Sequence, residues 1–437
     1  MPAAAADSAL YRSLFSDDDT AALFTDSAEI RAMLLVEGAL ARVQGGLGII
    51  PQTAAAFIDR SSREVQIDPA ALAAETATNG VPVPALVAAF RKGMGAPDHA
   101  QYLHWGATSQ DIMDTGQALR LRRLTAIWDE RLGQLAAALG RLARQYADLP
   151  MAARSYGQVA TPTSFGAVVA GWGHPLLRHR ARLATLAPEL ATVSLGGAAG
   201  TLSVMDGQGP AVRAGLAEAL GLRDPGHSWH AERDSIGAFA AWMAGLCASL
   251  GKMGEDLILM VQSGIGEIRI EGAGGSSTMP QKQNPVGASV LVALARQSVA
   301  LSSALQGAGI HRQQRDGAAW FVEWLSLPQL CISTGRALAL ALDLSQRIAP
   351  DAQAMARGLD DGSGLIHAEA LTFALARHLP RPEAQARIKA ICAEVQSSGQ
   401  PLPALVARDF PDLDLSGIGG LGTAPDEARA FADAAGA

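Results

Sequence analysis

The chain has 437 residues, which is enough to bury a large core and more than a single domain usually needs. Hydrophobic residues make up 49% of it and aromatic residues only 5%, a balance that favours helices over sheets. The formal net charge of -7 gives no reason to expect nucleic-acid binding, so an acidic substrate would need local positive groups.

Cysteine usage and the first residues bear on the compartment. Cys247, Cys331 and Cys392 lie far apart without metal-binding spacing, as is typical of buried thiols in a reducing compartment. The opening MPAAAADSALYRSLFSDDDT is acidic where a signal peptide would be basic. The longest uncharged stretch, 155–177, carries polar residues and glycines, which favours a buried protein helix over a membrane span. We therefore expect a soluble cytoplasmic protein.

The predicted helices are short before the segment HWGATSQD and long after it. Apolar residues recur at steps of three and four over 121–142, with Asp114 and Thr115 as candidate caps and Pro150 as a stop. The same spacing predicts a second long helix over 236–260. Because alternating β patterns and hairpin dipeptides are scarce, we expect further helices at about 162–190, 285–308 and 327–347.

Long helices with few breaks predict an all-α chain built around an elongated bundle. The stretch that opens PDAQAMARGLDDGSG reads as the start of a small helical domain. The expected domains are an N-terminal helical domain over 1–112, a central long-helix bundle over 113–349 and a C-terminal helical domain over 350–437.

The segment GAGGSSTMPQKQNP, 272–285, follows the second long helix and is rich in glycine. Most glycine-rich loops are only turns, so a plain connector is one interpretation. A phosphate-binding loop is excluded, because the GxxxxGK[ST] spacing and a preceding strand are both missing. The remaining option is a catalytic loop, in which glycines let the backbone close over a ligand and supply N–H donors.

Three segments carry a resemblance to a known superfamily. GSSTMPQKQNP, 275–285, resembles the signature loop of the fumarase, aspartase and argininosuccinate lyase superfamily. HWGATSQDIMDT, 104–115, and ARSYGQVATPTSFG, 153–166, are similar to its first and second substrate-binding segments. The resemblance implies a three-domain, all-α subunit whose central bundle forms the core of a homotetramer, with each active site shared between subunits.

Within that superfamily the chain resembles the bacterial 3-carboxy-cis,cis-muconate cycloisomerases, the lactonizing enzymes of protocatechuate (β-ketoadipate) breakdown. The supporting stretches are FTDSAEIRAMLLVEGALARVQGGLGIIP, LGGAAGTLS, SWHAERDS and WFVEWLSLP. The resemblance implies a cofactor-free isomerase that makes a carboxymuconolactone by intramolecular addition of a carboxylate. The superfamily's shared step transfers a proton at a carbon next to a carboxylate, through an aci-carboxylate carbanion.

The resemblance also implies roles for the loop. Ser276 would be the base and acid of the proton transfer, with Ser277 as the runner-up, while Lys282 and Asn284 bind a substrate carboxylate. Serine is a poor base at its ordinary pKa, so it needs a desolvated site rich in donors. Lysine is usually a solvated surface charge, but its place in the signature loop favours the functional role for Lys282.

A departure in the second segment discriminates among superfamily members. Amine-expelling lyases usually carry a histidine that helps to protonate the leaving group, and Tyr156 stands at that position. A carboxylate group, whose conjugate acid has a pKa of about 4, needs little such help. Tyr156 therefore argues against adenylosuccinate and argininosuccinate lyase activity, although the lactonizing enzymes usually have tryptophan there.

Other residues complete the expected site. Trp229 and Trp324 replace the polar residues with which purine-type lyases handle a nucleotide, although ordinary packing is the commoner role of a tryptophan. Arginines that flank the motifs fit either substrate binding or ion pairs between helices, and a lone histidine is more often a packing residue. The expected substrate-binding residues are His104, Thr108, Ser109, Ser155, Tyr156, Gln158, Lys282 and Asn284, with Arg154, His230, Arg233, Arg315 and Trp324 as further candidates.

Neither a metal site nor a nucleotide cofactor fingerprint is indicated, since the nine histidines are scattered and no HxxE or HxxxH pair shares a helix face with carboxylates. We expect a small polycarboxylate substrate, no nucleic acid and no membrane. Two alternatives stay open: a superfamily lyase acting on a succinyl-type substrate, and a structural relative that has lost catalysis. The intact Ser276, Lys282 and Asn284 weigh against the latter.

Overall fold

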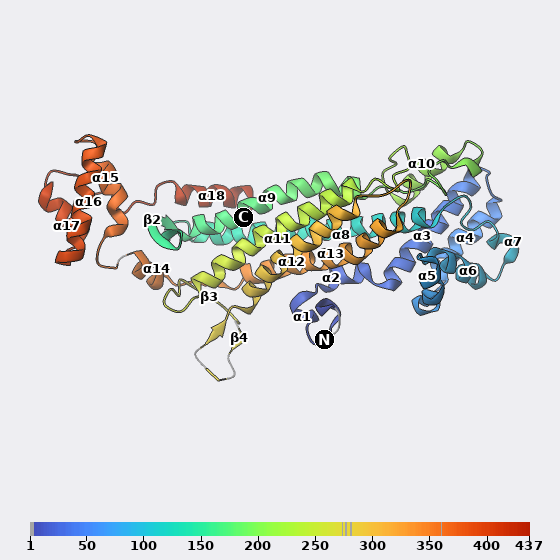
Figure 1. Ribbon diagram of the computed structural model, residues 1–437, viewed down its shortest axis with the longest axis horizontal. Coiled ribbons are helices and arrows are strands. Elements are labelled where there is room, and N and C mark those ends of the chain that lie inside the picture. The colour runs from blue at the N-terminus through green and yellow to red at the C-terminus, as the bar shows by residue number, and fades with distance from the viewer. Residues whose placement is uncertain (1–3, 273, 276–277, 280–281, 360) are drawn as a thin grey trace. The chain divides into compact units, whose positions relative to one another are not determined.

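The computed structural model describes residues 4–272, 274–275, 278–279, 282–359 and 361–437. Helices dominate this part of the chain and its strands form three two-stranded sheets, so the all-α prediction is confirmed. Figure 1 labels the helices and strands of the chain, which divides into two compact units. The three domain ranges expected from the sequence stay a prediction. Unit 1 contains Met1–Leu132, Arg178–Gly251 and Ala293–Ala339, and unit 2 contains Gly133–Leu177, Lys252–Val292 and Leu340–Ala437.

Five long helices form the framework, and each contributes residues to both units. Their apolar stripes are buried, as the spacing of three and four predicts. In unit 1, Trp128 stacks on Trp242 with ring centroids 5.9 Å apart, and Phe239 packs against both rings. The five helices are α8 (Ser109–Gln145), α9 (Phe165–Leu190), α11 (Asp234–Met260), α12 (Val286–Ala308) and α13 (Gly317–Ser345).

The start of α8 differs from the expectation that Asp114 and Thr115 are caps. The backbone N–H of Thr108 donates to the Asp111 carboxylate at 2.9 Å, one half of a capping box, so the helix begins earlier. Asp114 and Thr115 lie inside the helix and are buried. Thr115 Oγ1 donates to a backbone carbonyl of another segment at 2.9 Å. Tertiary hydrogen bonds therefore occupy the side chains that the sequence suggested as caps.

The start of α13 also precedes the expected start near residue 327. Asp316 caps it, because its Oδ1 accepts a hydrogen bond from the Ala318 N–H at 2.9 Å. Pro328 consequently lies inside the helix. A proline there removes one backbone hydrogen bond and costs about 3 kcal/mol. Burial of the neighbouring Leu327 and Leu330 offsets part of that cost.

The expectation of helix through residues 155–164 is wrong. This stretch lies in an antiparallel hairpin of β1 (Pro150–Ser155) and β2 (Gln158–Ser164). Tyr156 and Gly157 form its two-residue turn with φ values of 52° and 74°. Positive φ at both central positions is the type I′ geometry, whose twist matches that of paired strands. Tyrosine is uncommon in such a turn, so this dipeptide did not indicate a hairpin.

The shorter helices of unit 1 are α1 (Arg12–Phe15), α2 (Asp18–Ala21), α3 (Asp26–Gly46), α4 (Gln52–Glu64), α5 (Ala73–Asn79), α6 (Val83–Met94), α7 (Pro97–Ala100) and α10 (Gly209–Leu220). Among them, α3, α4, α6, α7 and α10 contribute residues to a core that includes Met33, Leu40, Ile58 and Phe90. Short 3-10 helices across the chain are Ala5–Asp7, Ala22–Phe24, Pro69–Leu72, Ser203–Met205 and Leu365–His367.

In unit 2, α15 to α17 enclose a small core of their own that includes Leu371, Ile388 and Leu405. The antiparallel pair β3–β6 joins segments distant in the sequence, whereas β4–β5 pairs the two ends of one loop. The elements are α14 (Ala352–Leu359), α15 (Ala368–Leu375), α16 (Arg381–Ser398), α17 (Leu402–Asp409), α18 (Ala424–Ala434), β3 (Ile268–Ile270), β4 (Gly274–Gly275), β5 (Gln283–Asn284) and β6 (Ile348–Pro350).

The helices α11, α12 and α13 are long and apolar enough, by length and composition alone, to cross a membrane. Within their most apolar windows, 56%, 44% and 61% of the residues are buried inside the chain. Large apolar side chains are exposed on all three, at Leu259 (55%), Val299 (58%) and Leu325 (68%). These helices therefore carry apolar surface that the single chain leaves uncovered.

Candidate active site

The first candidate segment ends at the N-terminus of α8. Thr108 and Ser109 are half-buried there, where the positive end of the helix dipole favours an anion. Gly106 gives the chain its turn into the helix with a φ of 71°. A Cβ at this position would lie 2.7 Å from the mobile end of the Met205 side chain, and the positive φ itself favours glycine.

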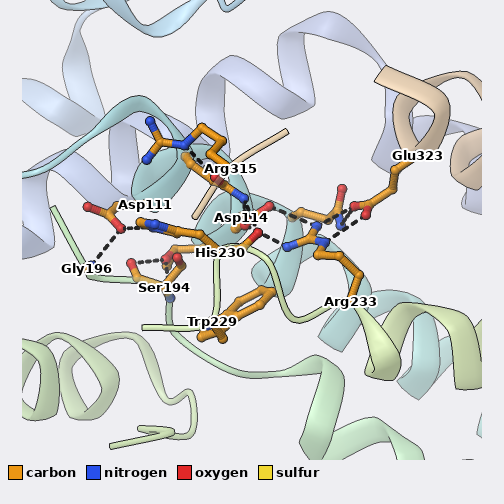
Figure 2. Close-up of polar contacts among 12 residues, drawn as sticks. Asp111, Asp114, Ser194, Gly196, Trp229, His230, Arg233, Arg315 and Glu323 are labelled. Carbon is orange, nitrogen blue, oxygen red and sulfur yellow. Dashed lines mark hydrogen bonds and ion pairs between the residues drawn. The ribbon is translucent and has the colours of Figure 1, made fainter. Parts of the chain in front are cut away.

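Asp111 ties this helix start to a second segment of unit 1 (Figure 2). Its side chain is 1% exposed and accepts hydrogen bonds from the backbone N–H groups of Thr108, Gly196 and Gly197 at 2.8–2.9 Å. His230 Nε2 lies 2.7 Å from Asp111 Oδ1, and because a carboxylate only accepts, the histidine is the donor. Asp111 thereby fixes the backbone of LGGAAG beside the helix start.

Gln110, next to Asp111 in the chain, forms hydrogen bonds with three other residues. Its amide nitrogen donates to Asp114 and to the His230 carbonyl at 3.1 and 2.9 Å, and its amide oxygen accepts from Arg315 Nε at 2.8 Å. The sequence allowed two roles for Arg315, substrate binding or a structural ion pair between helices. Its Nε is used here to orient a fully buried glutamine.

Arg233 lies between two buried carboxylates, Asp114 and Glu323 (Figure 2). It donates to Asp114 at 2.8 and 3.2 Å and to Glu323 at 2.5 and 2.9 Å, and all three side chains are at most 2% exposed. Burial lowers the pKa of the guanidinium, but the two carboxylates outweigh it and raise that pKa. Burial and Glu323 raise the pKa of Asp114 against the effect of Arg233. This geometry supports the ion-pair interpretation of Arg233.

His104 is the charged candidate at the start of the segment. Its Nδ1 lies 2.6 Å from Oε1 of Glu37, which is 1% exposed. Burial alone would lower the pKa of the imidazole, but Glu37 and the more distant Asp111 outweigh it and raise that pKa. The ring is 20% exposed, so part of it remains open to a ligand.

The second candidate segment lies in unit 2. Ser155, Tyr156 and Gln158 are exposed at the tip of the β1–β2 hairpin, and Tyr156 shows the full exposure of a free side chain. Arg154 instead binds the 1% exposed Glu267 through two hydrogen bonds of 2.8 and 2.9 Å. Such a bidentate pair is typical of a structural arginine.

The signature loop also belongs to unit 2. Ser276 and Ser277, the base and its runner-up, lie outside the described residues. Residues on either side of them form the β4–β5 pair, with Gly274 opposite Asn284. Lys282 is exposed and Asn284 is half-buried. The strand pair brings the two ends of the loop together.

The two candidate tryptophans lie in unit 1. Trp229 donates from Nε1 to the Val193 carbonyl at 2.8 Å and stacks under Arg233, whose guanidinium carbon lies 5.1 Å from the ring centroid. Trp324 packs edge-on against Trp320 with centroids 4.7 Å apart. Both Trp320 and Trp324 line a largely apolar cavity of about 530 Å³. The contacts of Trp229 are those of a packing residue.

Five polar residues of this region were not singled out from the sequence: Glu37, Gln110, Asp111, Asp114 as a network member, and Glu323. Asp111 had a signal, because Thr108-x-x-Asp111 is a capping-box pattern. Glu37 had one too, as a lone carboxylate in the apolar run AMLLVEGALA. Among the described residues, no group of three or more His, Cys, Asp or Glu side chains is arranged to hold a metal ion.

Known proteins resemble the chain over most of its length. A 3-carboxy-cis,cis-muconate cycloisomerase of Pseudomonas aeruginosa is 39% identical over 405 residues, covering 92% of this chain and 88% of that relative. The solved 3-carboxy-cis,cis-muconate lactonizing enzyme from Pseudomonas putida superposes with a TM-score of 0.92 at 34% identity, covering 98% of this chain and 100% of the other. A nitrosuccinate lyase of Streptomyces davaonensis is 35% identical over 413 residues, covering 92% and 87%.

A family model described as lyase matches residues 10–299. That range includes the helix start at Thr108, the hairpin with Tyr156 and the signature loop. The chain therefore belongs to the lyase family, within the fumarase, aspartase and argininosuccinate lyase superfamily that its three motifs indicated.

Proposed function

We propose that this enzyme is a cofactor-free 3-carboxy-cis,cis-muconate cycloisomerase. The observation that carries the proposal is the 39% identity to such a cycloisomerase over 92% of the chain. The exposed Tyr156 at the hairpin tip supports it, because an amine-expelling lyase would need an acid at that position. The nitrosuccinate relative keeps a succinyl-type lyase as the alternative for the test below.

The proposed reaction is the addition of one substrate carboxylate to a carbon–carbon double bond of the same molecule. A C–O bond forms, the π electrons move to the carbon next to another carboxylate, and the resulting aci-carboxylate carbanion takes a proton. In our proposal Ser276 supplies that proton and regains one from water before the next turnover, because lactonization consumes one proton overall; in the reverse direction Ser276 removes the proton. Backbone N–H groups of the loop would stabilise the serine alkoxide.

The remaining candidates would hold the carboxylates. His104, Thr108 and Ser109 surround the N-terminus of α8, where helix amides and a histidine favour anions. In the same proposal, Ser155, Gln158, Lys282 and Asn284 serve the other carboxylates. Local positive charge is needed, because the net charge of -7 repels a trianionic substrate at long range.

We also propose a soluble, cytoplasmic homotetramer. The support is the apolar surface on the long helices, at Leu259, Val299 and Leu325. Burial of such surface between copies stabilises an oligomer by about 25 cal/mol per Å². Light scattering of the purified chain would distinguish a tetramer from a monomer.

The reaction is tested by the ultraviolet absorbance of 3-carboxy-cis,cis-muconate, a conjugated diene that lactonization consumes. Metal-free parent protein should remove the absorbance quickly, and Ser276→Ala should lower the rate by at least a hundredfold, within the range for general acid–base catalysis. Ser277→Ala is the matched control and should retain most of the activity. A folded parent that leaves the absorbance unchanged would rule the proposal out and direct the search to succinyl-type lyase substrates.

A further inference from the structure

Two buried polar residues of α3 hold the turn at His104. Gln44 Nε2 donates to the Trp105 carbonyl at 2.7 Å, and Glu37 Oε1 lies 2.6 Å from His104 Nδ1. Glu37 and Gln44 are 1% and 0% exposed and lie seven residues apart, which places them on one face of the helix. Buried polar groups are costly unless they are hydrogen-bonded. These two contacts satisfy one atom of each side chain, while Glu37 Oε2 and Gln44 Oε1 are buried without a partner among the described residues.

The turn itself is held in an unfavourable conformation. His104 has a φ of 63°, in the left-handed region that few residues other than glycine adopt. Arg91 of α6 fixes the preceding backbone, donating to the carbonyls of Ala100 and Leu103 at 3.3 and 3.1 Å. Strain of this kind persists only where several contacts impose it, and it clusters at functional sites.

The pairing with Glu37 decides the chemistry of the imidazole. A carboxylate accepts only, so Nδ1 carries the proton that faces Glu37. A neutral ring would then present a lone pair at Nε2, which repels a carboxylate, whereas an imidazolium presents an N–H donor. Glu37 from α3, Asp111 from α8 and Arg91 from α6 are the charged groups that act on the ring, and the carboxylates prevail and raise its pKa.

We propose that Glu37 is a positioning residue that holds His104 as an imidazolium, so that Nε2–H donates to a carboxylate of the substrate. Among the described residues Nε2 has no protein partner within hydrogen-bond distance, and the ring is 20% exposed. The identity of the substrate rests on the proposed function, but the Glu37–His104 pairing does not. Raising the pH would remove the donor and weaken substrate binding.

The test compares Glu37→Gln with the parent by NMR titration of histidine labelled at the ring carbons, using His104→Gln to assign the signal. We expect the His104 pKa to fall in Glu37→Gln, and the alkaline limb of the kcat/KM profile to move to lower pH. At pH 8, KM for 3-carboxy-cis,cis-muconate should rise about tenfold, the loss caused by about 1.4 kcal/mol of binding, with a smaller change in kcat.

A matched control exists at the surface of the same unit. His227 Nε2 lies 3.0 Å from Glu232, but these side chains are 56% and 58% exposed. Glu232→Gln should leave the His104 pKa and the pH profile unchanged. The double variant Glu37→Gln/His104→Gln should be no less active than His104→Gln alone, because Glu37 acts through the histidine.

Two results would overturn the inference. One is an unchanged His104 pKa in Glu37→Gln, and the other is a double variant whose loss of activity is the sum of the losses in the two single variants. Circular dichroism checks that Glu37→Gln folds. If it does not, the NMR titration of the parent remains decisive, since the inference requires a His104 pKa above that of an exposed imidazole. An enzyme inactive on the muconate would contradict the proposed function, while the NMR titration would still decide the pairing.

Discussion

Replacing Arg233 by methionine tests the buried ion-pair network. The change keeps most of the side-chain volume and removes the charge, which leaves Asp114 and Glu323 buried at 2% and 1% exposure without their cation. Breaking a buried pair by removing one partner costs about 3–5 kcal/mol. Loss of the contact between Arg233 and the Trp229 ring adds about 0.5–1 kcal/mol. We therefore expect a loss of about 4 kcal/mol or more in the free energy of unfolding.

The assay is urea unfolding followed by circular dichroism at fixed protein concentration, with Arg180→Met as the control. Arg180 also binds one carboxylate through two hydrogen bonds, but Arg180 and Asp129 are 48% and 44% exposed, so the expected loss is about 0–1 kcal/mol. Equal losses of unfolding free energy in the two variants would show that burial of the carboxylates does not set the cost.

The pH dependence of Arg233→Met gives a second check. Burial and Glu323 already raise the pKa of Asp114, and Arg233 is the group that opposes them. In the variant the folded state therefore binds protons at a higher pH than the unfolded state does. Because protonation then favours the folded state, the loss of unfolding free energy relative to the parent should shrink as the pH falls from 7 to 5. A loss independent of pH would show that burial of the carboxylates is not its cause.

Two further outcomes are expected. Gly157→Ala should destabilise the β1–β2 hairpin by about 1–2 kcal/mol, because Gly157 has a φ of 74°. Hydrogen exchange of the strand amides should show this loss. The control is Gly171→Ala in α9, where no atom lies within 4 Å of an added Cβ, and it should cause no loss. Burial, with Arg182 and Arg178, lowers the pKa of His179 to about 4, and NMR titration should find that value. Since the unfolded value is about 6.5, His179 should contribute stability above that pH and lose it as the pH falls toward 4, and His179→Gln should flatten this dependence.

The helical framework and the family can be predicted from local patterns in the sequence. Apolar residues at steps of three and four predict long amphipathic helices wherever they fall, and α8 and α11 contain the expected ranges 121–142 and 236–260. The loop segments GSSTMPQKQNP and HWGATSQD identify the superfamily, because each is a long and specific residue pattern. Both signals are local, so a single stretch of chain carries them.

The helix starts, the hairpin and the charged network depend on contacts between residues that are far apart in the sequence. Asp114 looks like a cap from its neighbours, but Arg233, far along the chain, holds it inside α8. Tyr156 is an unusual turn residue, and the pairing of β1 with β2 fixes it there. Glu37 can be recognised as a lone carboxylate in an apolar helix, but its partner His104 is 67 residues away. Such pairs form only when distant segments come into contact during folding. A buried charge is tolerated only where such a contact provides a partner of opposite charge.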